Sequence, residues 1–254
     1  PGANGLIAAQ QVARAAPDGY TVFITSMTTQ SVNPFLYKKL PYDPVADFIP
    51  VAMISKTAMV LVVRNTEDQP KSVAELTARM QAAGSKLSFA SGNTSSLVAG
   101  KTYSNAVSSP ALHVPYKGIP QAVTDLMAGA VDFMFSDLTV ANPLVQQGRL
   151  RGLGVTGPTR ASTLPDVPTM REAGMPIELS VWAGAYVPAK TPHAVVVRLN
   201  ELLNQATQSK QGQERFKQTG GTVDTMSPEE FAKFNEQEVL FWGRAVRGAG
   251  IQPE

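Results

Sequence analysis

The sequence contains no cysteine and only two histidines among its 254 residues. Without cysteine it can form no disulfide, no thiolate nucleophile and no thiolate metal site. The two histidines, His113 and His193, are too far apart in sequence to form the H-x-x-x-H pair of a helical metal site. We therefore expect no metal and no cofactor.

The sequence also lacks a strong charge of either sign and any long apolar run. Lys and Arg number 22 and Asp and Glu number 20, which leaves a formal net charge of +2. That charge is too small to favour nucleic acid or an anionic membrane surface. No apolar run approaches the roughly 18 residues of a membrane span. We expect neither a nucleic-acid partner nor direct insertion into a membrane.

The common catalytic motifs are missing as well. There is no P-loop, no G-x-G-x-x-G and no G-x-S-x-G elbow, and the glycines of Gly152-Leu153-Gly154 lie inside an expected strand. A serine hydrolase using Ser95 or Ser96 would need His113 or Lys117 as its base. This remains the enzymatic alternative, but the residues favour a protein that binds without reacting.

The length and the order of the expected elements indicate an α/β protein. A chain of 254 residues can bury one large core or two smaller ones. Strands and helices alternate from Lys86 to Thr156, which is typical of parallel βαβ units. Helices are expected over 4–16, 72–83, 97–107, 120–127, 142–147, 169–173 and 209–219, and after residues 191 and 227. Strands are expected over 20–24, 51–54, 59–63, 87–90, 131–135, 153–156 and 181–187, and residues 111–118 are expected to form a strand that ends in a loop.

Turn and cap residues support these assignments. Ser72 with Glu75 and Ser227 with Glu230 have capping-box spacing, and Thr191 before a proline is placed to cap a third helix. Glycine at the C-terminal end of a helix is expected at Gly84 and at Gly129.

One stretch combines several features of an anion site. Ser91, Gly92, Asn93, Thr94, Ser95 and Ser96 follow an apolar strand and precede a helix. Glycine permits close approach of a ligand, and Ser95 or Ser96 is placed to cap the helix, whose first N–H groups attract anions. The alternative is an ordinary β–α loop with a capping serine.

Two further strand exits carry polar side chains. Thr25 to Ser31, which includes Ser26, Met27, Thr28 and Thr29, follows the strand at 20–24, and Asp137 follows the strand at 131–135. Open α/β sheets bind ligands at such exits. The alternatives are a polar connecting loop for the first and a helix-capping aspartate for the second.

Several motifs, taken in order, resemble one family across the whole chain. They are Pro1-Gly2-Ala3-Asn4-Gly5, residues 13–21, residues 33–44, Ser91-Gly92-Asn93, residues 113–118, residues 164–169 and Glu172-Ala173-Gly174. The combination is similar to the Bug-type tripartite tricarboxylate transporter receptors, which are periplasmic solute-binding proteins.

The resemblance implies a two-lobed α/β periplasmic solute-binding protein (Venus-flytrap) fold with a ligand cleft between the lobes. We assign residues 1–58 plus 188–254 to the first lobe and 59–187 to the second. The family usually begins with a strand, a glycine-rich loop with a ligand-facing aspartate, and a helix before the Pro-Gly-Ala segment. The first lobe is therefore expected to lack these elements.

The resemblance also implies a function and a set of site residues. A small carboxylate would be captured in the cleft and delivered to membrane transporter subunits by a periplasmic monomer. Carried over by position, the ligand-binding residues are Ser26, Met27, Thr28, Thr29, Ser91, Gly92, Asn93, Thr94, Ser95, Ser96, Asp137 and Trp182. A dicarboxylate is favoured, and Met27 and Trp182 would offer apolar surface to an aromatic one such as terephthalate. A ligand-sensing module of a signalling system is the alternative.

Overall fold

The computed structural model describes residues 3–83 and 86–253, and its contacts divide the chain into two compact units. Unit 1 comprises Pro1–Lys56, Trp182–Phe216 and Thr222–Glu254, and unit 2 comprises Thr57–Val181 and Lys217–Gly221. The sequence expectation placed the boundaries after residues 58 and 187 and kept 217–221 in the first lobe.

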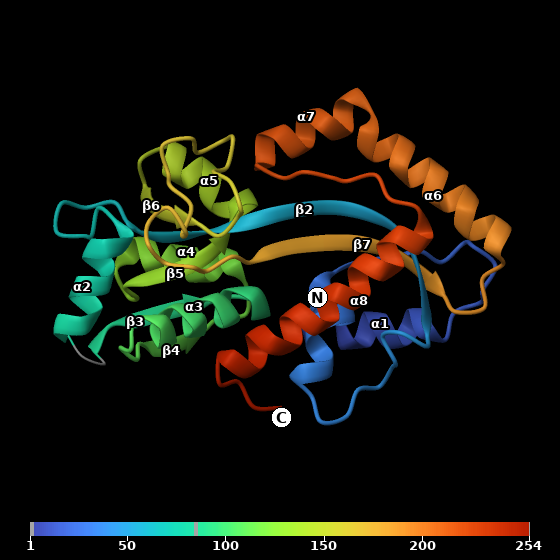
Figure 1. Cartoon of the computed structure of the whole chain (residues 1–254), viewed down its shortest axis with the longest axis horizontal. Coiled ribbons are helices and arrows are strands. Elements are labelled where there is room, and N and C mark those ends of the chain that lie inside the picture. Colours follow the sequence, from blue (N-terminus) through green and yellow to red (C-terminus); the bar gives the residue numbers. More distant parts are fainter. Residues whose placement is uncertain (1–2, 84–85, 254) are drawn as a thin grey trace. The chain divides into compact units, whose positions relative to one another are not determined.

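Unit 2 is built on a mixed sheet (Figure 1). Its strands are the second part of β2 (Phe48–Arg64), β3 (Ser88–Ser91), β4 (Leu112–Pro115), β5 (Phe133–Asp137) and β6 (Leu150–Val155). β4, β3 and β5 are parallel neighbours, as the alternation predicted. β2 pairs antiparallel with both β5 and β6, so the sheet is not purely parallel.

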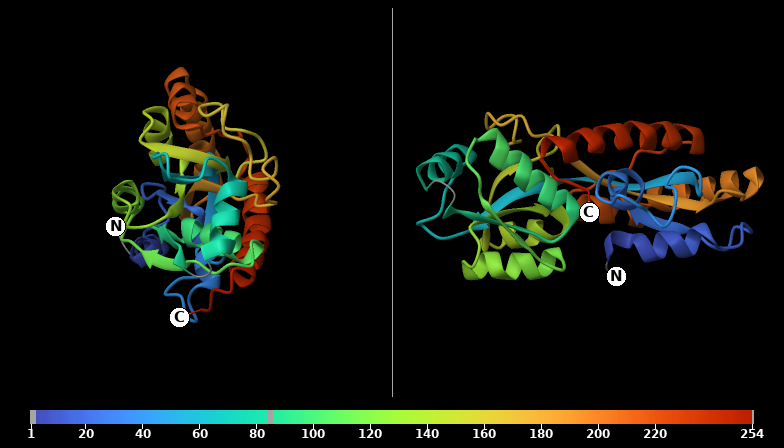
Figure 2. Two further views of the ribbon diagram at one scale, coloured as in Figure 1. Left: turned by 90° about the vertical axis from the view of Figure 1, so that its left-hand side faces the viewer. Right: turned by 90° about the horizontal axis from the view of Figure 1, so that it is seen from below.

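Helices cover both faces of this sheet. The helices of unit 2 are α2 (Val73–Ala83), α3 (Thr94–Ala106), α4 (Ile119–Ala128) and α5 (Leu138–Gln146). Alternate residues of the strands face opposite sides. Phe89 and Phe133 pack toward α3, where Gly100 and Tyr103 receive them, whereas Ala90 and Met134 pack with α4 and α5. Figure 2 shows α3 and α4 on opposite sides of the strands.

Unit 1 has its own three strands and long helices. Its sheet contains β1 (Phe23–Ser26), β7 (Ser180–Pro188) from Trp182 onward, and β2 up to Lys56, in the order β1-β7-β2. The helical elements are η1 (Ala3–Gly5), α1 (Leu6–Ala13), η2 (Thr28–Val32), η3 (Asn33–Phe35), α6 (His193–Gln208), α7 (Lys210–Thr219, divided between the units) and α8 (Pro228–Gly248). Ala185, Val187 and Val196 form a core under α6, and Phe231 of α8 packs against Gly184 on the opposite face.

Several expected elements differ in the structure. The two strands expected at 51–54 and 59–63 are one continuous strand, β2, because no turn residue interrupts the polar stretch between them. Residues 28–32, expected as a loop, form a π-helical turn, η2. Residues 169–173 form a hydrogen-bonded turn, closed by the Ala173 N–H to Thr169 O bond, and not a helix.

The expected caps were partly correct. Ser227 and Glu230 form a complete capping box, and Gly129 ends α4 with a φ of 79°. Ser72 Oγ accepts from Glu75 N, but the Glu75 carboxylate turns back to Lys71 N. Thr191 does not cap α6, because its hydroxyl donates to Pro188 O. The expected helix end at Gly84 lies outside the described residues.

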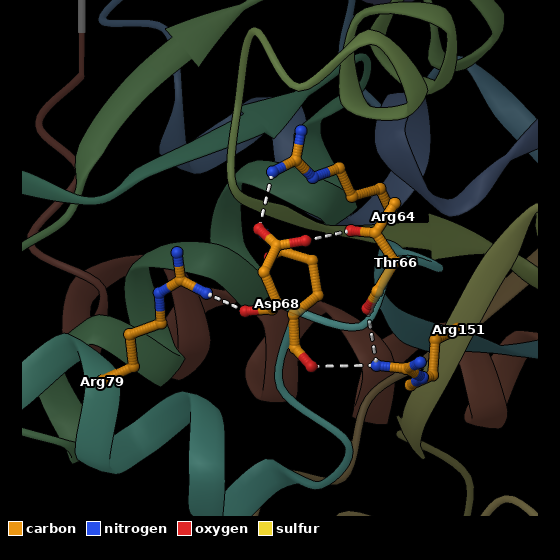
Figure 3. Close-up of polar contacts among 6 residues, drawn as sticks. Arg64, Thr66, Asp68, Arg79 and Arg151 are labelled. Carbon is orange, nitrogen blue, oxygen red and sulfur yellow. Dashed lines mark hydrogen bonds and ion pairs between the residues drawn. The ribbon is translucent and has the colours of Figure 1, made fainter.

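The loop after β2 is fixed by arginines (Figure 3). Arg151 Nη1 donates to the carbonyl oxygens of Thr66, Gln69 and Pro70, and Arg79 Nη1 donates to that of Asp68. Arg64 pairs with the Asp68 carboxylate at 2.9 Å. These bonds satisfy loop carbonyls that have no sheet partner, and so they define the end of β2.

Candidate functional site

Three parallel strands of unit 2 end side by side, and each leads into a helix. β3, β4 and β5 are neighbours in the sheet, and α3, α4 and α5 begin within a few residues of their ends. The first N–H groups of a helix have no partner within the helix and lie at the positive end of its dipole. Three helix N-termini at one edge of a parallel sheet favour an anionic ligand.

Asn93 is the cap of α3, and the expectation that Ser95 or Ser96 caps it is wrong. The Asn93 Oδ1 atom accepts from Ser96 N at 2.9 Å, and Ser96 Oγ accepts from Asn93 N at 3.2 Å. Ser96 Oγ also accepts from Gly92 N and donates to the Asn93 carbonyl. An Asn at this position is as good a cap as Ser, so α3 begins earlier, at Thr94.

These internal bonds determine which donors of the loop remain for a ligand. The N–H groups of Gly92, Asn93 and Ser96 are already paired within the loop. Ser95 Oγ donates to Asn93 Oδ1, and Ser91 Oγ lies 2.7 Å from His113 Nε2. The remaining groups are the backbone N–H groups of Thr94 and Ser95 and the Thr94 hydroxyl, which makes no hydrogen bond within the described residues.

Gly92 has a packing reason to be glycine. A Cβ at this position would overlap the carbonyl carbon of Gly118 and the amide nitrogen of Ile119. The loop after β3 therefore lies directly on the backbone at the start of α4. Its glycine holds two of the three helix N-termini close together, which a larger residue would prevent.

Asp137 occupies the N-cap position of α5, yet its side chain does not cap that helix. Its Oδ2 atom accepts from Asn93 Nδ2 at 3.1 Å, which joins the end of β5 to the cap of α3. Oδ1 is shut off from solvent and has no hydrogen-bond partner among the described residues. Burial raises the pKa of this carboxyl, and the Asn93 hydrogen bond opposes the rise.

The geometry also addresses the hydrolase alternative. Ser95 and Ser96 both donate to Asn93, and the imidazole of His113 lies at Ser91 instead. His113 stacks on Phe89 at 5.0 Å, and burial lowers its pKa, with Lys101 adding to the effect. A serine nucleophile requires a hydrogen bond to a general base, and neither Ser95 nor Ser96 makes one.

In unit 1 the expected site residues Ser26 to Thr29 lie at the last residue of β1 and directly after it. Ser26 is exposed and Thr28 is half-buried, whereas Met27 is 1% exposed and Thr29 is buried. Thr29 Oγ1 lies 2.8 Å from Thr25 Oγ1 and donates to Ser26 O. The hydroxyls that remain unpaired in this stretch are thus those of Ser26 and Thr28.

Trp182 also belongs to unit 1, where it is held by a residue that the sequence pattern missed. Its indole Nε1 donates to Glu238 Oε2 at 2.7 Å, and Trp242 Nε1 donates to the same oxygen at 3.1 Å. The ring of Trp182 packs edge-on against Phe231 and Phe234 and is 2% exposed. Glu238 lies 56 residues away in sequence, on α8, so no local motif marks it.

The expected site residues are thus divided between the units. Ser91 to Ser96 and Asp137 come together in unit 2, while Ser26 to Thr29 and Trp182 lie in unit 1. Among residues 3–83 and 86–253, no three His, Asp or Glu side chains form a group that would hold a metal ion. No helix in those ranges is long and apolar enough to cross a membrane.

Known proteins resemble this chain over nearly its whole length. A protein from Pseudomonas sp. strain P51, named for the tcbD-tcbE intergenic region, is 36% identical over 96% of this chain and 74% of its own length. BugT of Bordetella pertussis is 30% identical over 99% of this chain and 78% of its own.

Solved structures show the same fold. The periplasmic binding protein BugD superposes with a TM-score of 0.90 at 32% identity, over 100% of this chain and 86% of its own. An R. palustris protein solved with adipate has a TM-score of 0.93 at 29% identity, over 100% and 85% of the two chains. MatC from Rhodopseudomonas palustris, solved with malate, has a TM-score of 0.86 at 29% identity, over 96% and 85%.

These neighbours are two-lobed periplasmic solute-binding proteins, which confirms the expected fold class. They are binding proteins and not enzymes. This agrees with the hydrogen bonds of Ser95 and Ser96, which both donate to Asn93 and not to a catalytic base. The model of the tripartite tricarboxylate transporter family receptor matches residues 1–251. The chain therefore belongs to the tripartite tricarboxylate transporter receptor family, whose members are periplasmic solute-binding proteins.

Proposed function

We propose that this protein captures a small dicarboxylate and delivers it to a tripartite tricarboxylate-type membrane transporter. Membership of the receptor family supports the role, and two structural neighbours were solved with dicarboxylates, adipate and malate. The observation that carries the proposal is the meeting of three helix N-termini, those of α3, α4 and α5, at one edge of the unit 2 sheet.

The strength of such a site comes from several modest contributions. One helix N-terminus contributes about 0.3–1 kcal/mol per charge when exposed and up to about 2 kcal/mol when partly buried. Micromolar affinity needs about 8 kcal/mol. Helix N-termini alone fall short of this value, so hydroxyl donors must add to them.

The proposed ligand-binding residues are those expected from the sequence, and the hydrogen bonds rank them. In unit 2 we give first place to Thr94, Ser95 and Asp137, because the polar groups of Gly92 and Ser96 are paired within the loop. In unit 1 we give first place to Ser26 and Thr28, whose hydroxyls are unpaired. Met27 and Trp182 would contact an aromatic ligand only if they left their buried positions.

A ligand screen of the full-length protein tests the proposal. Thermal shift followed by isothermal titration calorimetry would compare mono-, di- and tricarboxylates, with malate, adipate and terephthalate among the dicarboxylates. We expect micromolar or tighter binding of at least one dicarboxylate. Absence of binding to every member of the panel would contradict the proposal.

Periplasmic location, a monomeric state and delivery to a transporter are parts of the same proposal. Cell fractionation would test the location, and light scattering would test the oligomeric state. For delivery, uptake of the labelled ligand by cells should be lost when the gene is deleted and restored when it is supplied again. Uptake that continues unchanged in the deletion strain would argue against delivery.

A further inference from the structure

The side chain of Asp137 lies at the start of a helix but does not bond to it. An aspartate at an N-cap ordinarily accepts from the N–H groups of the first turn. Here the carboxyl turns toward α3 and accepts from Asn93 Nδ2 at 3.1 Å. It is therefore placed between two helix N-termini, with the first turn of each beside it.

The environment of this carboxyl disfavours its negative charge. Oδ1 is buried without a partner among the described residues, and Oδ2 receives a single neutral hydrogen bond. Burial of an unpaired carboxylate is unfavourable, and the group commonly takes up a proton instead. A protonated carboxyl also gains an O–H donor, which needs an acceptor.

A ligand carboxylate is the acceptor that this arrangement lacks. We infer that Asp137 is protonated in the ligand complex and donates its O–H to a ligand carboxylate oxygen, so that ligand capture takes up a proton. The inference rests on the proposed function, because it assigns a state to a residue of that same site. The proton comes from solvent, stays on Asp137 and forms the hydrogen bond, and no covalent bond of the ligand changes.

Two carboxyl groups in contact share one proton because both cannot carry charge at short distance. Ligand binding therefore raises the pKa of Asp137 above its value in the free protein, which burial has already raised. At pH values above the pKa of Asp137 in the free protein, Asp137 must take up a proton before the ligand binds. The affinity for the ligand therefore falls about tenfold for each unit by which the pH rises.

The charged groups on the neighbouring elements do not account for the raised pKa of Asp137. Burial and the Asn93 hydrogen bond are the two influences on the Asp137 pKa. The elements around it carry Lys101 on α3, His113 and Lys117 at β4 and its exit, Asp125 on α4, and Lys217 at the end of α7. The β2 residues beside it, Met59 to Val62, are apolar. Of these groups His113 is the rival titrating group, because its imidazole lies 2.7 Å from Ser91 in the loop after β3. Burial lowers the pKa of this imidazole.

The test is the affinity of the full-length protein for its best dicarboxylate from pH 5.5 to 9.5. We expect affinity to fall about tenfold per pH unit in the upper part of this range, where an aliphatic dicarboxylate is ionised throughout. Calorimetry in two buffers of different ionisation enthalpy should show uptake approaching one proton per ligand. Asp137→Asn keeps a donor and should bind with the pH slope removed.

Two control variants locate the titrating group. Asp125→Asn, the same substitution on α4, and His113→Gln should both keep the wild-type slope. A slope that disappears in His113→Gln, or that survives in Asp137→Asn, would overturn the inference. An affinity that does not change with pH, or that rises with pH, would also overturn the inference. A rise would mean that ionised Asp137 accepts a hydrogen bond from the ligand.

The proton uptake of the wild-type protein tests whether ligand binding protonates Asp137, even if Asp137→Asn fails to fold. Zero uptake at every pH would overturn the inference and leave the proposed function intact. Failure of wild-type protein to bind any dicarboxylate at any pH would overturn both.

Discussion

The Glu238 carboxylate and the Trp182 indole are joined by a hydrogen bond of 2.7 Å, and Trp242 donates to the same oxygen at 3.1 Å. Both tryptophans of the protein therefore depend on one acidic residue. Trp182 is the first residue of β7 within unit 1, and Glu238 lies on α8. Lys56, the last residue of β2 in that unit, lies over the ring of Phe234 at 5.6 Å and is paired by its backbone with Thr222.

Removing the Glu238 side chain should destabilise unit 1. Glu238→Ala leaves two buried indole N–H groups without an acceptor, at about 1–3 kcal/mol each. Glu238→Gln keeps an oxygen acceptor and should cost less than Glu238→Ala. Urea unfolding followed by tryptophan fluorescence measures the difference, and equal losses in the two variants would contradict the assigned role of the oxygen.

The same residue should make stability depend on pH. Burial raises the pKa of Glu238 from its usual value of 4.5, and the two indole bonds and Lys56 oppose the rise. The native state therefore holds the proton more tightly than the unfolded chain. This contribution to stability is complete below the unfolded pKa and is lost as pH rises through the folded one. Stability curves of wild type and Glu238→Gln should converge at acid pH and diverge toward neutrality.

The contact between the loop after β3 and the start of α4 predicts a strong effect at one glycine. Gly92→Ala places a methyl group against the backbone of Gly118 and Ile119, and overpacking of this kind costs about 1–3 kcal/mol. Gly248→Ala, in a helix where no atom of the described residues lies within 4 Å of the added methyl, should be neutral or stabilising by up to about 1 kcal/mol. Thermal unfolding compares the two, and a neutral Gly92→Ala would show that the loops are not in contact.

Much of the fold could be predicted because the local patterns agree with it. The helical runs of α2, α4, α6 and α8 and the strands β3, β5 and β7 were expected from periodicity and caps. Thr191 resembles a cap in sequence, but its hydroxyl finds a closer acceptor in Pro188 O. The cap of α3 was assigned to Ser95 or Ser96 because those serines directly precede the apolar run, whereas Asn93 begins the helix earlier.

The candidate site was less predictable because its roles depend on distant partners. Asp137 meets Asn93 across 44 residues of sequence, and Trp182 meets Glu238 across 56. The hydroxyl-rich stretch at Ser91–Ser96 is visible in the sequence, but which hydroxyls are already paired is decided by the fold. Gly92 and Ser96 therefore have structural roles that composition alone does not reveal.

The unpaired hydroxyls should matter for binding and little for folding. Under the proposed function, Thr94→Ala and Ser26→Ala would each remove one neutral hydrogen bond to the ligand and should weaken affinity by up to about tenfold. Thr124→Ala, an exposed threonine on α4 that bonds to Pro120 O, is the matched control and should bind normally. Calorimetry at constant pH measures all three, and normal affinity in Thr94→Ala and Ser26→Ala would remove these residues from the site.

The arginine-held loop after β2 should respond both to mutation and to acid. Arg151→Ala leaves the carbonyls of Gln69 and Pro70 without this donor, at about 1–3 kcal/mol, whereas Thr66 O keeps its bond from Gln69 N. Hydrogen bonds from Thr66 and Gln69, together with Arg64, lower the pKa of Asp68 to about 2. This contribution is present above the unfolded pKa of 3.8 and is lost as pH falls toward 2.

Acid unfolding of Asp68→Asn compared with wild type tests this second effect. The variant should lack part of the stability that the wild type gains as pH rises from about 2 to 3.8. Identical acid-unfolding curves would show that the loop does not depend on the charge.

The most direct test of the central claim is the titration of the full-length protein with a dicarboxylate and its matched monocarboxylate, such as adipate and hexanoate, by isothermal titration calorimetry. Receptor function predicts micromolar or tighter binding of a dicarboxylate and an affinity at least tenfold weaker for the monocarboxylate of equal chain length. Equal affinity for the two acids, or no binding of any dicarboxylate in the panel, would contradict it.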